Sequence, residues 1–169
     1  MQFTIRKINL EDAEMLLRHT QLVFTQSSFL LTTSEEFNLT VEKQRLWISD
    51  QLKLGNFLLV AECNGKIIGF LNASQSQRKR VSHNCMFGIS IQKDYWNKGI
   101  GRKMIEKMID WAINHPTIEK VGLEVFAHNE RAIHLYQSLG FVEEGRKKKH
   151  IKFEDGTYVD ELMMSKFVK

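Results

Sequence analysis

Proline and cysteine are scarce in this sequence of 169 residues, which has one proline, Pro116, and two cysteines, Cys63 and Cys85. Without proline-rich, repetitive or low-complexity tracts there is no candidate linker, so we expect a single domain over residues 1–169. Neither cysteine belongs to a C-x-x-C pair, and both lie in strand-like apolar runs. We therefore expect both to be reduced, buried side chains with no disulfide or redox role.

Long apolar runs are also missing, and the longest apolar stretch is too short to cross a bilayer. Residues 1–10 alternate like a strand and lack the apolar core of a signal peptide. The 24 Lys and Arg residues against 20 Asp and Glu residues give a net charge of +4, too small to indicate nucleic-acid binding. These absences predict a cytoplasmic protein without a membrane or nucleic-acid partner.

Clustered metal ligands are absent as well. The six histidines form no H-E-x-x-H motif, and the spacing of His128 and His134 places them on different faces of a helix. We therefore expect no metal site. The basic run at residues 146–150 could contact an anionic partner, although such a run is more typical of a solvated strand or loop.

Hydrophobic periodicity and turn residues predict the order strand, two helices, three strands, helix, strand, helix and two strands. Asn64-Gly65 predicts a tight hairpin turn, and Thr40 is a good N-cap for the second helix. This order suits an α+β, or mixed α/β, fold with helices on the faces of a mostly antiparallel sheet. Strands are expected at residues 3–7, 57–63, 66–73, 84–91, 120–126, 141–142 and 158–167, and helices begin near residues 10, 40, 99 and 129.

The segment Trp96–Lys103 connects a buried strand to a long helix and contains Gly99 and Gly101. A helix N-terminus carries unpaired N–H groups and partial positive charge, and glycines let phosphate oxygens approach the backbone. Formal positive charge is added by Lys98, Arg102 and Lys103. The segment therefore predicts a phosphate or pyrophosphate site. Its spacing fits neither a Walker motif nor a dinucleotide fingerprint, and G-x-G alone could simply make a tight turn.

This segment resembles motif A of the GNAT acetyltransferases, Gln/Arg-x-x-Gly-x-Gly/Ala, with Trp96 in place of the usual Gln or Arg. A second segment, residues 124–141, resembles motif B, Asn-x-x-Ala-x-x-Leu-Tyr-x-x-x-Gly-Phe. The matching positions of motif B are Asn129, Ala132, Leu135, Tyr136, Gly140 and Phe141. The resemblance extends over residues 57–167 and is strongest to bacterial amino-acid and ribosomal-protein N-terminal acetyltransferases.

The resemblance implies a twisted sheet of about seven strands with about four helices, and acetyl-CoA-dependent N-acyltransferase activity. It further implies that the loop amides bind the coenzyme pyrophosphate, and that the backbone of residues 89–91 holds the pantetheine arm and polarises the thioester. The coenzyme-binding residues are then Ile89, Ser90, Ile91, Trp96, Asn97, Lys98, Gly99, Ile100, Gly101, Arg102, Lys103, Asn129, Ala132 and Tyr136.

Two residues have catalytic roles by the same resemblance. Tyr136 would be the general acid for the departing thiolate, although its place on the helix face of Ala132 also suits core packing. Glu124 projects from the strand face opposite to Leu123 and Val125 and would take a proton from the incoming amine. A solvated glutamate on a sheet face explains Glu124 equally well.

The sequence does not name the acyl acceptor. A small amine or amino acid is the first hypothesis, a protein N-terminus or lysine is the second, and a non-catalytic coenzyme-A-binding sensor is the third. The basic run at residues 146–150 could also meet the 3′-phosphate of the coenzyme. Related enzymes often pair, so a homodimer is an open expectation.

Overall fold

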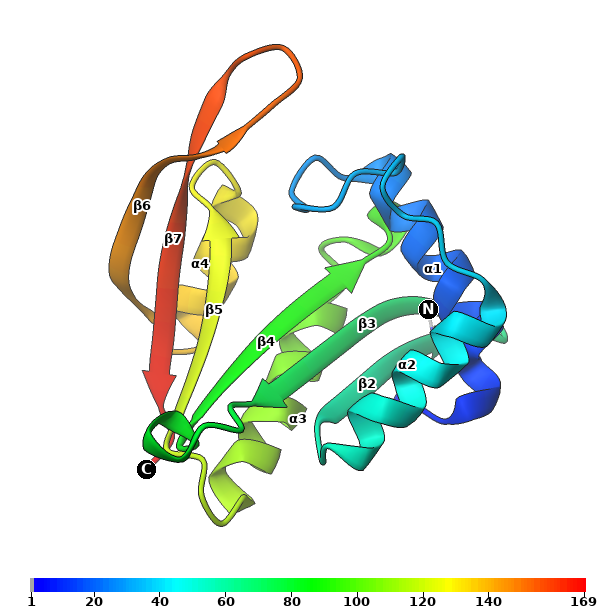
Figure 1. Ribbon diagram of the computed structural model, residues 1–169, viewed down its shortest axis with the longest axis horizontal. Helices are drawn as coiled ribbons and strands as arrows, with labels where there is room; N and C mark the ends of the chain where they lie inside the picture. Colours follow the sequence, from blue (N-terminus) through cyan, green and yellow to red (C-terminus); the bar gives the residue numbers. More distant parts are fainter. Residues whose placement is uncertain (1) are drawn as a thin grey trace. The chain divides into compact units, whose positions relative to one another are not determined.

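The computed structural model describes residues 2–169, in which seven strands form one sheet accompanied by four α-helices and three short 3₁₀ helices (Figure 1). The strand order is β1-β2-β3-β4-β5-β7-β6. The elements are β1 (Thr4–Lys7), η1 (Leu10–Asp12), α1 (Ala13–Gln26), α2 (Val41–Lys53), β2 (Phe57–Cys63), β3 (Lys66–Gln75), η2 (Lys79–Val81), β4 (Asn84–Ile91), η3 (Lys93–Tyr95), α3 (Ile100–Asn114), β5 (Lys120–Phe126), α4 (Glu130–Ser138), β6 (Val142–Lys152) and β7 (Tyr158–Phe167).

Most strand pairs are antiparallel. The pairs β1–β2, β2–β3, β5–β7 and β6–β7 all run antiparallel, whereas β4 and β5 run parallel. The predicted order of elements and the predicted fold class are therefore confirmed. The chain divides into two compact units, one made of residues up to Ser74 with Ile89–Met108, and the other of Gln75–Gly88 with Ile109–Lys169.

The first unit is built around a hairpin and two helices. Helices α1 and α2 lie together against one face of β2 (Figure 1). Thr40 caps α2 as predicted, because its side-chain oxygen accepts a hydrogen bond from the Lys43 backbone N–H at 3.3 Å. The hairpin turn is also confirmed, with φ of +49° at Asn64 and +69° at Gly65. The core on this face comprises Ile8, Ala13, Leu16, Ile48, Leu58, Val60 and Ile67.

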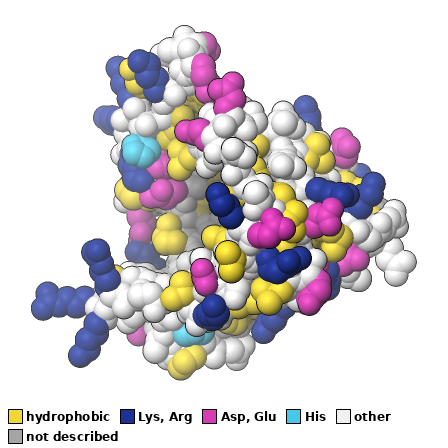
Figure 2. All heavy atoms as spheres, turned by 45° about the vertical axis from the view of Figure 1, so that its right-hand side comes forward, with side chains coloured by type: hydrophobic (Ala, Val, Ile, Leu, Met, Phe, Trp, Pro, Cys, Tyr) yellow, Lys and Arg dark blue, Asp and Glu magenta, His cyan; other side chains and the backbone are white. Residues whose placement is uncertain are grey.

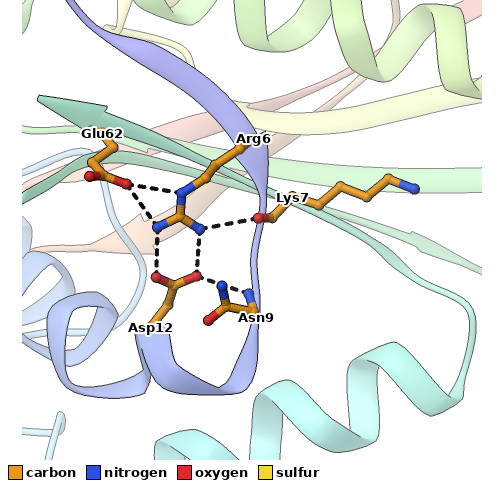
Figure 3. A network of polar contacts seen from close by, with 5 residues as sticks. All are labelled: Arg6, Lys7, Asn9, Asp12 and Glu62. Carbon is orange, nitrogen blue, oxygen red and sulfur yellow. Dashed lines mark hydrogen bonds and ion pairs between the residues drawn. The ribbon is translucent and has the colours of Figure 1, made fainter. Parts of the chain in front are cut away.

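An arginine joins the start of the chain to β2 in the same unit (Figure 3). Arg6 on β1 donates from Nη1 and Nη2 to the two carboxylate oxygens of Asp12, at 2.7 Å each, and from Nε to Glu62 at 2.9 Å. Asp12 also accepts from the backbone N–H of Asn9, and its side chain is only 3% exposed. This paired fork fixes β1, η1 and β2 to one another.

The second unit places β5, β7 and β6 side by side, with α4 following β5 in the chain (Figure 1). Along β5 the side chains alternate, so that Leu123 and Val125 are buried while Glu124 between them is exposed. Phe87, Tyr136 and Phe141 form an aromatic cluster with ring centroids 5.7–6.1 Å apart. Through Phe87, this cluster packs α4 against the part of β4 that belongs to the second unit.

Strand β6 is much longer than the sequence predicted. We expected a strand at residues 141–142, whereas β6 continues to Lys152 and includes the whole basic run. Its register with β7 is irregular between Glu143 and Gly145 and again between Lys147 and Ile151, and Lys149 has a φ of +49°. These irregularities and the lysines interrupt the alternation of apolar and polar residues by which a strand is recognised.

Both cysteines are free and buried, as the sequence predicted. Burial raises the pKa of the Cys85 thiol to about 12, which keeps it protonated and unreactive. Over the described part of the chain, no helix is both long and apolar enough for a membrane span. The same residues contain no group of three or more His, Cys, Asp or Glu side chains suited to a metal ion.

Candidate active site

The loop that begins α3 has an unusual backbone in the first unit. Asn97 has a φ of +59° and Gly99 a φ of +76°, and the helix starts directly afterwards at Ile100. The left-handed conformation at Gly99 disfavours other residues, while a Cβ added there would meet no atom within 4 Å. The backbone thus turns sharply into an open space at the N-terminus of a 15-residue helix. Such a turn presents amide N–H groups to an anion.

Side chains hold this loop in place. The Trp96 indole donates to the Ile91 carbonyl at 2.7 Å, and the Lys98 ammonium donates to the Asp94 carbonyl at 2.7 Å. Ile100 and Met104, both buried, anchor the first turns of α3. Trp96 therefore ties the loop to the end of β4, and this explains why an indole can stand where the family pattern has Gln or Arg.

The end of β4 is packed very closely against β3. A Cβ at Gly69 would lie 2.6 Å from Ile91 Cδ1 and 3.3 Å from Met104 Sδ, so a larger residue there would require the Ile91 side chain to shift. The register of β4 with β5 runs from Asn84 to Met86, opposite Lys120 to Gly122. Residues 89–91 lie beyond these three pairs, which leaves the expected pantetheine-binding backbone outside the parallel ladder.

A buried histidine contacts the same strand from α1. His19 is 1% exposed, and its Nε2 lies 3.0 Å from Ser90 Oγ. Its Nδ1 lies 3.3 Å from the Gln92 side-chain nitrogen. Sequence analysis missed this contact, since α1 and β4 are about seventy residues apart and nothing local marks the pair.

In the second unit, α4 presents the motif-B residues. The Asn129 side chain caps the helix by accepting from the Ala132 N–H at 3.3 Å. Tyr136 is 7% exposed within the aromatic cluster, and burial raises the pKa of its hydroxyl to about 12, against the opposing charge of Arg131. The hydroxyl therefore stays protonated at any physiological pH, as a proton donor must.

Glu124 on β5 is not an isolated carboxylate. The Lys147 ammonium lies 2.5 Å from Glu124 Oε1 and 3.0 Å from Glu161 Oε2. Glu161 is 2% exposed and is also approached by His150 Nε2 at 3.4 Å. Both carboxylates raise the pKa of Lys147, the Glu124 hydrogen bond having the larger effect. Sequence analysis missed Lys147 and Glu161, because their pairing across β6 and β7 depends on tertiary register.

The structure thus brings the predicted site residues together in two groups. In the first unit, the loop 96–103 is tied to residues 89–91 by Trp96. In the second, Asn129, Ala132 and Tyr136 share α4, and Glu124 lies on the neighbouring strand β5.

The basic run at residues 146–150 is dispersed along β6. Arg146 pairs with Glu143 at 3.5 Å and with Asp160 at 3.4 Å, and the ammonium of Lys149 lies over the ring of Tyr158. Figure 2 shows a face on which Lys and Arg side chains are mixed with Asp and Glu side chains over much of the surface, and a group of Lys and Arg side chains projects at the lower left. Within the basic run, Arg146 and Lys147 are paired with carboxylates and Lys149 with an aromatic ring, which is typical of a solvated strand.

Comparison with known proteins identifies the family of the chain. The model of the Acetyltransferase (GNAT) family matches residues 24–141. The chain is 34% identical over 108 residues to the L-amino acid N-acetyltransferase AaaT of Escherichia coli K12, covering 64% of this chain and 66% of the relative. It is 32% identical over 80 residues to the spermidine N(1)-acetyltransferase of Vibrio cholerae, covering 47% and 46%. The matched part therefore spans less than two thirds of the length of these relatives.

Solved structures agree over nearly the full chain. An acetyltransferase of the GNAT family from Streptococcus pneumoniae has a TM-score of 0.93 and 33% identity, covering 98% of this chain and 99% of its own. The yncA protein of Salmonella typhimurium, a putative acetyltransferase solved with its cofactor acetyl-CoA, has the same fold, with a TM-score of 0.87 at 19% identity and coverage of 100% and 95%. The chain belongs to the GNAT acetyltransferase family, whose members use acetyl-CoA.

Proposed function

We propose that this chain is an N-acetyltransferase that moves an acetyl group from acetyl-CoA to the primary amine of a small molecule, with an amino acid as the first candidate. The observation that carries the proposal is the left-handed turn at Asn97 and Gly99 that leads into α3. The match to the GNAT family model supports it, as does the similarity to a relative named as an amino-acid N-acetyltransferase.

The positive charge and the open turn at the start of α3 support a coenzyme site in the first unit. Its pyrophosphate would lie against the amides of residues 99–103, where the open space beside Gly99 leaves room for phosphate oxygens. Lys98, Arg102 and Lys103 supply positive charge next to these amides. Backbone groups of residues 89–91 would bind the pantetheine arm.

Acetyl-CoA supplies an activated thioester, which a neutral amine attacks at the carbonyl carbon. Tyr136 would donate a proton to the departing sulfur while the C–S bond breaks and the new C–N bond remains. Its pKa of about 12 ensures that the hydroxyl holds this proton before each turnover. The proton that the amine must lose would pass to Glu124, directly or through water.

The position of Glu124 is consistent with that role. Its carboxylate accepts an N–H from the Lys147 ammonium, so a Glu124 oxygen is open to a nitrogen donor. Glu124 is also the more exposed of the two carboxylates that contact Lys147, with a side chain 38% exposed against 2% for Glu161. A purely structural ion pair is the alternative reading, and a pH–rate profile separates the two.

Thiol release from acetyl-CoA tests the function directly. Amino acids, polyamines, aminoglycosides and N-terminal peptides form the acceptor panel, and release that depends on an amino acid supports the proposal. Release only with peptides would assign a protein acceptor. Coenzyme binding without release across the panel would instead favour the sensor hypothesis.

Tyr136→Phe tests the mechanism. Loss of the general acid should lower kcat by about 10²-fold or more, while acetyl-CoA binding stays within about twofold, because the ring still packs on Phe87. Tyr158→Phe, at a half-exposed position on β7, is the matched control and should leave kcat unchanged. Unchanged turnover in Tyr136→Phe would remove this residue from the mechanism.

Two further expectations stay proposals. The free, buried cysteines are compatible with a reducing compartment, so we propose a cytoplasmic location. A homodimer is tested by sedimentation of the purified protein.

A further inference from the structure

The buried imidazole of His19 has no role in the reaction described above. It lies on α1 at a position that is otherwise apolar, between the buried residues Leu16 and Val23. A buried polar ring destabilises a core unless its nitrogens are hydrogen-bonded, and both nitrogens of His19 have partners on or next to β4. The ring therefore connects α1 to the strand segment expected to hold the coenzyme arm.

The hydrogen bonds around Gln92 favour one tautomer of His19. The Gln92 side chain approaches the Ile67 carbonyl oxygen at 2.9 Å, so the atom facing that carbonyl is the amide nitrogen. The same nitrogen lies 3.3 Å from His19 Nδ1, and a hydrogen bond between the two requires an unprotonated Nδ1. In this tautomer the ring proton is on Nε2, which lies 3.0 Å from Ser90 Oγ and donates to it.

Burial keeps His19 in this neutral form. It lowers the pKa of the imidazole to about 4, against the opposing effect of the Ile67 carbonyl. A neutral ring with its proton on Nε2 cannot remove the proton of Ser90. In this tautomer Ser90 is not an activated nucleophile, and its hydroxyl proton is available to another acceptor.

The strand is held rigidly at this point. Ile91 packs against Gly69 and Met104 on one side of β4, while Ser90 faces His19 on the other. Gln92 is held by its backbone N–H, which donates to the Ile68 carbonyl at 3.0 Å. A half-buried hydroxyl fixed by a histidine on such a strand is a preorganised hydrogen-bond donor.

We propose that Ser90 donates a hydrogen bond to the thioester carbonyl oxygen of bound acetyl-CoA, and that His19 is the positioning residue that orients this hydroxyl. The inference rests on the proposed function, since it requires acetyl-CoA to bind along residues 89–91. It adds a side-chain donor to the backbone N–H groups of the strand. The developing negative charge on the carbonyl oxygen would then be stabilised by two kinds of donor.

The decisive measurement is the ¹³C resonance of acetyl-CoA labelled at the acetyl carbonyl and bound to the intact protein. A hydrogen bond to this oxygen moves the resonance downfield, so Ser90→Ala should move it back toward its value in water. The same variant should lower kcat by about 10²-fold while the KM for acetyl-CoA changes by less than about threefold. Ser49→Ala, on α2, is the matched control and should change neither quantity.

Histidine variants separate orientation from packing. His19→Phe keeps a ring but removes the donor, and should reproduce both the resonance and the kcat of Ser90→Ala. His19→Gln keeps an amide donor, so its carbonyl resonance and its kcat should both lie between those of His19→Phe and those of the wild type. Nitrogen-15 spectra of the free protein should show a proton on Nε2 and none on Nδ1 of His19 between pH 6 and pH 8.

Three outcomes would overturn the inference and leave the proposed function standing. In the first, acetyl-CoA binds but Ser90→Ala does not move its carbonyl resonance. In the others, both histidine variants lose turnover equally with an unmoved resonance, or the nitrogen-15 spectra show the His19 proton on Nδ1. Failure of wild-type protein to bind acetyl-CoA would overturn the proposed function, and the inference with it.

Discussion

Two clusters of the same charge composition lie in the two units of this protein. In the first, Arg6 lies between Asp12 and Glu62 (Figure 3), and in the second, Lys147 lies between Glu124 and Glu161. Each has one cation and two carboxylates, yet their geometry differs. Arg6 makes three directed hydrogen bonds to the carboxylates and a fourth to the Lys7 carbonyl. Lys147 makes one contact with each carboxylate from a single atom.

The difference separates a structural cluster from one that can exchange partners. A guanidinium fork fits Asp12 in one orientation, and both Asp12 and Glu62 belong to elements that this fork joins. A lysine ammonium is a point charge on a flexible chain, and Glu124 beside it is exposed. We conclude that directional donors and burial, and not the number of charges, distinguish the two roles.

Breaking the first cluster should have the largest effect. Arg6→Met leaves the buried Asp12 carboxylate without its main partner, so the free energy of unfolding should fall by about 3 kcal/mol. Denaturant titration measures this loss. Arg18→Met removes an exposed pair with Glu14 and should cost less than about 0.5 kcal/mol. Equal losses in the two variants would refute the assignment of a structural cluster.

Removing the charge of Glu124, the exposed carboxylate of the second cluster, should lower turnover and leave the free energy of unfolding nearly unchanged. Glu124→Gln should lower kcat by about 10²-fold, equivalent to about 2.7 kcal/mol, if this carboxylate accepts the proton of the amine. Unfolding free energy should change by less than about 0.5 kcal/mol, since the side chain is exposed. The pH–rate profile should lose its acidic limb.

Glu143→Gln is the control for that experiment, because Glu143 is a similarly exposed partner of Arg146. A wild-type pH–rate profile in Glu124→Gln would leave Glu124 with a structural role only.

Exchanging the two cations sharpens the comparison further. Arg6→Lys cannot reproduce the fork on Asp12 and should cost about 1.5 kcal/mol of unfolding free energy. Lys147→Arg can still reach two carboxylates and should cost less than about 0.5 kcal/mol. Thermal or chemical unfolding of both variants under the same conditions gives the two values. A larger loss for Lys147→Arg would reverse our ranking.

Acid should weaken the Arg6 cluster gradually. Burial raises the pKa of Asp12, but the hydrogen bonds from Arg6 and Asn9 and the charge of Arg6 together outweigh it, so the pKa is lowered overall. A lowered carboxyl pKa contributes stability that is present above the unfolded value, about 3.9, and is lost as the pH falls through the folded value. Arg6→Met leaves the raising effect of burial on the Asp12 pKa without the opposing effect of Arg6, and the unfolded states are alike at this carboxyl. The stability gap between wild type and Arg6→Met should thus be constant at neutral pH and begin to narrow as the pH falls through the raised Asp12 pKa of the variant.

Between the Asp12 pKa of the folded variant and the lower Asp12 pKa of the folded wild type, the gap should narrow by up to about 1.4 kcal/mol per pH unit. Measurement of unfolding free energy at a series of pH values tests this, and a gap that widens in acid would contradict it.

Much of the fold could be predicted because its signals are local. Thr40 and the Asn64-Gly65 turn act through neighbouring backbone groups, and β5 is bounded as the apolar run predicted. The structure differs from the sequence-based expectation where contacts between residues far apart in the chain determine which side chains are buried. Leu46 on α2 is apolar and yet 64% exposed, while Gln44 is buried, because packing against the rest of the unit sets which side of the helix faces inward.

The residues of the candidate site also fall into two groups, those with a local sequence signal and those without one. Gly99 and Tyr136 belong to contiguous motifs, so sequence alone could identify them. Lys147 and His19 could not be found, because their partners are set by the register of β6 on β7 and by the packing of α1 on β4. Positions that act through a partner far along the chain carry no local pattern.

The outer strand β6 bears on the solubility of the folded protein. As the last strand in the sheet, it has one row of backbone groups without a neighbouring strand, which could template aggregation with another chain. Its two register irregularities, the positive φ at Lys149 and its lysines all make such edge-to-edge growth unfavourable. The lysine-rich run therefore disfavours self-association of the sheet, while Lys147 of the same run pairs with Glu124 and Glu161 on β5 and β7.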